Sequence, residues 1–196
     1  LIGAFSGLAS GAGVVISQYY GAGKYDRVKD AVHTAVMMTL VLSVAFTAIG
    51  IAMTPNMLLL MKTPAEVFPE SRAYLNIYFS GMAGLMLYNM GAGILRAVGD
   101  SQRPLYFLIV CAVTNTVLDV VFVFCFNMGV AGVALATVIS QCLSAVLCGV
   151  YSWGIARKLG VSTAFSRLAA MMTLCMPILF AEAFTAEADI YSSLWM

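Results

Sequence analysis

One acidic residue lies deep inside an apolar stretch of this chain. Asp119 is the only carboxylate between Pro104 and Ala156, and Asn115 precedes it by four residues in the run PLYFLIVCAVTNTVLDVVFVFCF. Residues four apart lie on one face of a helix, so these two side chains can converge on a common point. A carboxylate with a carboxamide oxygen suits a hard cation, and a carboxylate alone can carry a proton. The pair therefore predicts cation binding or proton transfer.

Other apolar stretches contain isolated polar residues, namely Asn89, Thr137 and Gln141. If the helices pack as a bundle, their oxygens could complete a coordination shell around Asp119. The alternative is that they only hydrogen-bond between helices, a common and modest contribution. Asp119 differs from them, because an acid at the centre of a bilayer costs roughly 2.5 to 3.5 kcal/mol on insertion scales. It is therefore expected to face protein, water or an ion rather than lipid.

The composition places these residues in a membrane. Hydrophobic residues make up 62% of the 196 residues, charged residues only 10%, and the mean hydropathy is +0.95. A soluble domain carries about a quarter of its residues as charges. The net charge of +1 provides no general attraction for nucleic acid. We therefore predict an all-α, multi-pass membrane protein whose surroundings are a lipid bilayer.

Five stretches are nearly free of charged residues and long enough for the roughly 20 residues that a membrane-spanning helix needs. The predicted bundle covers residues 1–158, with spans at about 1–23, 31–61, 73–95, 104–126 and 129–156. The last two meet at Asn127-Met128-Gly129, which predicts a tight hairpin between antiparallel helices.

Basic residues alternate between the connections. The connections after the first, third and fifth spans carry seven Lys or Arg residues: Lys24, Arg27, Lys29, Arg96, Arg103, Arg157 and Lys158. The connection after the second span carries two, Lys62 and Arg72, and the connection after the fourth span carries none. By the positive-inside rule, the seven-residue set faces the cytoplasm. This predicts an inner (plasma) membrane protein whose first span runs from outside to inside.

No catalytic signature accompanies the spans. The sequence has no GxxxxGK[ST], GxSxG or HExxH motif. Its five cysteines form no CxxC pair and are best explained as packing residues rather than metal ligands. We therefore expect no enzyme activity, no cofactor and no metal beyond Na⁺ at Asp119, so an ion gradient would have to drive any transport.

The two ends of the chain are atypical. The sequence starts at Leu1 inside an apolar segment, so we expect a fragment. Residues 159–196 contain a short apolar run interrupted by Pro177 and followed by acidic residues. Such a tail fits an interfacial helix, an incomplete span or a sequence foreign to the gene.

Four segments resemble the multidrug and toxic compound extrusion family in the same order. They are GVVISQYYGAGKYDRVKDAV at 13–32, NMGAGILRAVGDSQRP at 89–104, NTVLDVVF at 115–122 and GVAGVALATVISQ at 129–141. The resemblance covers about residues 1–158. It implies helices two to six of the N-terminal lobe of a twelve-helix antiporter, without the first helix and the C-terminal lobe.

The resemblance also implies a function and a site. Family members with a cation site in this lobe bind the ion through side chains that resemble Asn89, Asn115, Asp119 and Thr137 here, together with an acid from the first helix, which this chain lacks. From its own position in the fifth span, Gln141 is a further candidate polar residue of the cavity. It implies a Na⁺- or H⁺-coupled antiporter that exports amphipathic organic compounds or drugs.

Two other functions remain open from the sequence. A lipid-linked oligosaccharide flippase of the same superfamily would also be polytopic, but it is expected to carry basic residues inside its cavity, and these spans contain none. A non-transporting, truncated remnant would explain the atypical ends. In that case the polar residues would record ancestry rather than activity.

Overall fold

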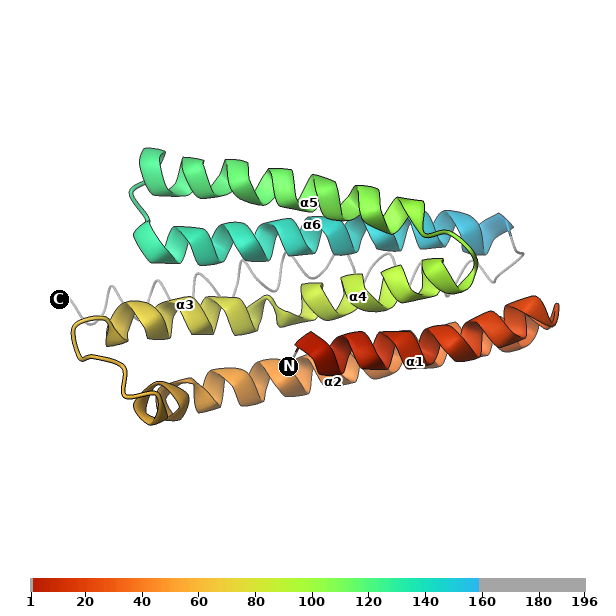
Figure 1. Ribbon diagram of the computed structural model, residues 1–196, viewed down its shortest axis with the longest axis horizontal. Coiled ribbons are helices and arrows are strands. Elements are labelled where there is room, and N and C mark those ends of the chain that lie inside the picture. The colour runs from red at the N-terminus through yellow and green to blue at the C-terminus, as the bar shows by residue number, and fades with distance from the viewer. Residues whose placement is uncertain (1, 159–196) are drawn as a thin grey trace.

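The computed structural model describes residues 2–158, and every element in this range is helical. Figure 1 shows the helices lying roughly side by side along the long axis of the molecule. The predicted all-helical membrane bundle is confirmed. The predicted tail, 159–196, lies outside the described residues.

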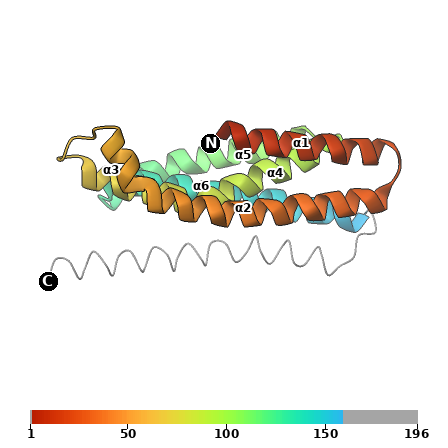
Figure 2. The ribbon, with the colours of Figure 1, turned by 90° about the horizontal axis from the view of Figure 1, so that it is seen from below.

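Helices α1 (Ile2–Gly21) and α2 (Tyr25–Leu60) form the first antiparallel pair, seen side by side in Figure 2. Gly23, with φ at +69°, allows the tight turn between them. The charged segment before residue 31 belongs to α2 rather than to a loop. Asp26 in the first turn complements the helix dipole and pairs with Lys29 at 3.2 Å, which stabilises this start.

The central element is a broken rod made of α3 (Phe68–Ser80) and α4 (Met82–Ala97), which packs against α1, α2 and α6. The break is at Gly81, where a Cβ atom would overlap the side chain of Val138 on α6. Phe5, Phe79, Met82 and Met86 form a buried cluster around this break. The rod therefore holds the outer helices together.

The second antiparallel pair consists of α5 (Gln102–Val120), a short π-helix η1 (Val121–Cys125) and α6 (Gly129–Lys158). Figure 1 shows α5 and α6 packed along their lengths. Asn127 and Gly129 take left-handed φ angles of 53° and 56° at the turn between them, a conformation that Asn and Gly tolerate well.

Three of the described helices are long and apolar enough to cross a membrane: Tyr25–Leu60, Gln102–Cys125 and Gly129–Tyr151. The other two predicted spans differ from these for physical reasons. Helix α1 has the polar residues Ser17 and Gln18 near its end, which shorten its apolar part, and the break at Gly81 divides the third predicted span into two short helices. Membrane crossing by these two segments remains a prediction.

Candidate functional site

The predicted site centres on the C-terminal end of α5. Asp119 is the second-last residue of α5, and Asn115 lies one helical turn before it. Both are half-buried, although α5 has no fully buried residue in its most apolar stretch. The site therefore lies at the α5–α6 interface of an otherwise exposed helix.

One carboxylate oxygen of Asp119 is an unsatisfied hydrogen-bond acceptor. This atom, Oδ1, is buried and accepts no hydrogen bond from any residue between 2 and 158. A buried polar atom without a partner usually costs about 1 to 3 kcal/mol, and more when it is charged. This oxygen can regain that energy from a proton or a bound cation.

Asn115 makes a hydrogen bond to another of the predicted site residues. Its Nδ2 donates to Oγ1 of Thr137 across the α5–α6 interface at 3.4 Å. This is longer than the usual 2.7 to 3.2 Å for N–H···O bonds. Thr137 Oγ1 also donates to the main-chain oxygen of Val133 at 3.0 Å within α6. The hydrogen bond between the helices is therefore weak. The side-chain oxygens of Asn115 and Thr137 can turn toward an ion at little cost.

Asn89 is not joined to this pair. Its Nδ2 donates to the main-chain oxygen of Leu85 at 2.8 Å, within α4. Among the described residues, no hydrogen bond links Asn89 to Asn115, Asp119 or Thr137. The bond to Leu85 uses only the amide nitrogen, so the Oδ1 atom of Asn89 keeps its acceptor capacity.

Gln141 lies on α6 one turn beyond Thr137 and is half-buried. Its main chain packs closely against Gly84 of α4. This contact brings α4 and α6 together next to the Asn115–Thr137 pair. Across residues 2–158, no three His, Cys, Asp or Glu side chains cluster as a transition-metal site would require.

The structure adds two features that the sequence reasoning missed. Asn76 on α3 also has a buried Oδ1 without a hydrogen bond. Its position in the apolar run of residues 73–95 is the same signal that identified Asn89. The second feature is η1, which begins two residues after Asp119. Short π-helical turns occur often at functional sites, but the sequence Val-Phe-Val-Phe-Cys gives no signal for one.

These observations define a helical membrane protein with a polar site on the face that α5 turns toward α6. The family model MatE matches residues 1–121. The chain is 38% identical over 149 residues to the probable multidrug resistance protein YoeA of Bacillus subtilis, covering 74% of this chain and 32% of that protein. It is 36% identical to the probable multidrug resistance protein YpnP of Bacillus subtilis, covering 69% and 30%.

A solved structure of a multidrug resistance MATE family transporter of the MOP superfamily, in its inward-facing conformation, has a similar fold. The TM-score is 0.74 at 22% identity, covering 89% of this chain and 44% of that one. The chain belongs to the MatE family, as its sequence motifs predicted. That family consists of transporters rather than enzymes. The chain spans about a third of the length of the curated relatives it matches.

Proposed function

We propose that this chain forms the cation-binding part of an antiporter that exports amphipathic organic compounds in exchange for Na⁺ or H⁺. The observation that carries the proposal is the unpartnered, buried Oδ1 of Asp119, one turn from the Asn115–Thr137 pair. The names of YoeA and YpnP support drug export as the activity. The inner membrane is the proposed location, because of the distribution of basic residues.

The coupling follows from differential binding. A cation at Asp119 would favour the arrangement of α5 and α6 in which its ligands converge. It can shift the balance between two arrangements only by its difference in affinity for them. In an alternating-access transporter, that shift would expose the substrate cavity to one side of the membrane and then to the other.

The test uses the gene product as the organism makes it, reconstituted in proteoliposomes loaded with ethidium. Na⁺ and pH gradients are imposed separately and together, without nucleotide. We expect ethidium efflux with at least one gradient and only background leakage with none. Efflux that ignores both gradients would refute the proposed coupling. Absence of ethidium transport, with movement of a lipid-linked oligosaccharide instead, would favour the flippase.

A further inference from the structure

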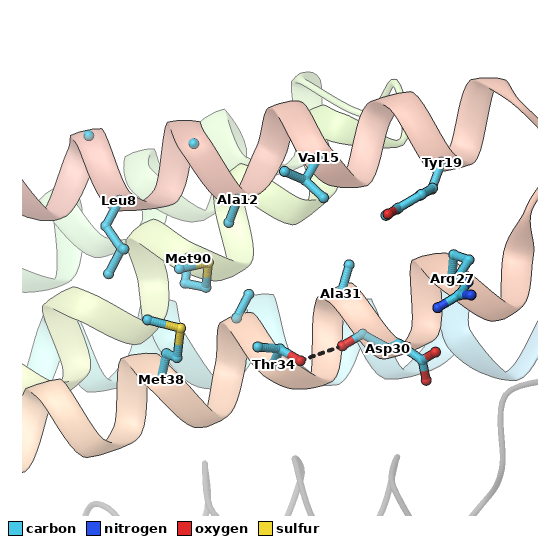
Figure 3. A pocket seen from close by; sticks show the side chains of 13 residues that line it. Leu8, Ala12, Val15, Tyr19, Arg27, Asp30, Ala31, Thr34, Met38 and Met90 are labelled. Atoms are coloured by element: carbon cyan, nitrogen blue, oxygen red, sulfur yellow. Dashed lines mark hydrogen bonds between the residues drawn. The ribbon is translucent and has the colours of Figure 1, made fainter.

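A second candidate binding site lies away from Asp119, between α1 and α2. A groove of about 560 Å³ separates the two helices, and Met90 of α4 closes its floor. Figure 3 shows that Leu8, Ala12 and Met38 surround Met90, whereas Tyr19, Arg27 and Asp30 lie toward the other end. The groove is therefore apolar along most of its length and charged at one end.

The charged end carries opposite charges on neighbouring turns of α2. Arg27 and Asp30 are both exposed. The ion pairs of the described residues join Lys29 to Asp26 and Arg103 to Asp100, so neither involves the charged pair of the groove. Tyr19 of α1 lines the same end of the groove. A ligand that matches this end needs an anionic and a cationic group a short distance apart.

The length of the groove matches one leaflet of a bilayer. Gly7 and Tyr19 lie at its two ends on α1 and are 12 positions apart (19 − 7). At about 1.5 Å per residue, this gives ~18 Å. Half of a hydrocarbon core about 30 Å thick is ~15 Å. The groove can therefore follow an acyl chain from the interface to near the bilayer centre.

The charged end also lies at the predicted cytoplasmic surface. It follows the turn at Gly21-Ala22-Gly23 and shares its segment with Lys24 and Lys29. By the positive-inside rule, this turn faces the cytoplasm. The tyrosine at this level is also typical of the membrane interface. A lipid in the groove would thus come from the inner leaflet.

We propose that the α1–α2 groove binds one phospholipid with an ethanolamine headgroup. The Arg27 guanidinium would hold the phosphate and the Asp30 carboxylate would hold the ammonium group, both through charge-assisted hydrogen bonds. One acyl chain would lie along Gly7, Gly11 and Met90. The carboxylate of Asp30 would repel an anionic phospholipid, and a choline headgroup has no N–H to donate to that carboxylate.

Two glycines make a sharp test possible. Among the described residues, a Cβ atom at Gly11, which lines the groove, would meet no atom within 4 Å, and the same is true at Gly3, which is outside the groove. Leucine also favours helix over glycine. Gly11→Leu should therefore fill the groove without disturbing α1, and Gly3→Leu is its matched control.

The experiment is native mass spectrometry of the delipidated full chain with added palmitoyl-oleoyl phospholipids carrying ethanolamine, choline or glycerol headgroups. We expect one tight ethanolamine lipid per chain, with about tenfold weaker binding in Gly11→Leu and in Arg27→Gln. Gly3→Leu and Lys29→Gln should bind as the unmodified chain does. Equal binding by Gly11→Leu and Gly3→Leu would refute the groove, and equal binding of the three lipids would refute the assigned headgroup.

A second measurement does not depend on variants. An ethanolamine lipid with a photoreactive group on its acyl tail is incorporated, together with the unmodified protein, into nanodiscs of choline lipids. After irradiation, the residues that carry lipid adducts are identified by peptide sequencing. We expect adducts on groove-lining residues of α1 and α2. Adducts restricted to the exposed face of α5, or to residues 159–196, would overturn the proposal.

Discussion

Asn115 on α5 donates its side-chain N–H to the hydroxyl of Thr137 on α6, 3.4 Å away and 22 residues further along the chain. The bond joins the two helices one turn from Asp119. Asn115 and Thr137 therefore meet between α5 and α6, one turn from Asp119. If the proposed function is right, a change in any of the three should alter coupling rather than overall stability.

Neutralising Asp119 should abolish gradient-driven transport. Asp119→Asn keeps the shape of the side chain but removes the charge that attracts a cation and the group that carries a proton. In the proteoliposome assay, we expect efflux to fall at least about tenfold while the helical circular dichroism is unchanged. Asp26→Asn is the matched control, because it makes the same change at an exposed carboxylate. Wild-type efflux in Asp119→Asn would contradict the role of Asp119.

Removing the Thr137 hydroxyl should weaken the cation site. Thr137→Val is nearly isosteric but cannot coordinate an ion or accept the bond from Asn115. We expect the cation concentration for half-maximal efflux to rise about three- to tenfold, and Thr137→Ser to restore it. Thr116→Val serves as the control, since the Thr116 hydroxyl bonds within α5 to the oxygen of Ala112 and is exposed. Equal effects of the two valine variants would exclude a specific role for Thr137.

The candidate residues could be named from the sequence because a single acid in an apolar helix is conspicuous. The short turn before Gly129 also indicated that α5 pairs with α6, which brings Asn115 to Thr137. The bond from Asn89 to Leu85 was not accessible, because an amide can bond within its own helix or beyond it. The π-helix was also missed. Its Phe122 lies where a side chain at Gly132 of α6 would be, and local sequence does not encode this tertiary approach.

A side chain at Gly81 should disrupt the α3–α4 rod. The added methyl group of Gly81→Ala would overlap the side chain of Val138, which is only 3% exposed and is stiff because it is β-branched. We expect a loss of about 1 to 3 kcal/mol in the free energy of unfolding, measured by denaturant titration in mixed micelles. Val138→Ala in the same chain should recover most of it. Gly11→Ala, where the methyl group meets open space, should cause no loss.

The Tyr88 hydroxyl should stabilise the start of α5. It donates to the main-chain oxygen of Pro104 at 2.9 Å, which ties α4 to the first turn of α5. Tyr88→Phe removes only this oxygen, so we expect the free energy of unfolding to fall by about 0.5 to 1.5 kcal/mol in the same titration. Tyr106→Phe is the control, because Tyr106 is 58% exposed. If both variants unfold at the same denaturant concentration, the bond to Pro104 contributes nothing. If only Tyr88→Phe unfolds at a lower denaturant concentration, the bond from Tyr88 to Pro104 fixes α5 at the end opposite to Asp119.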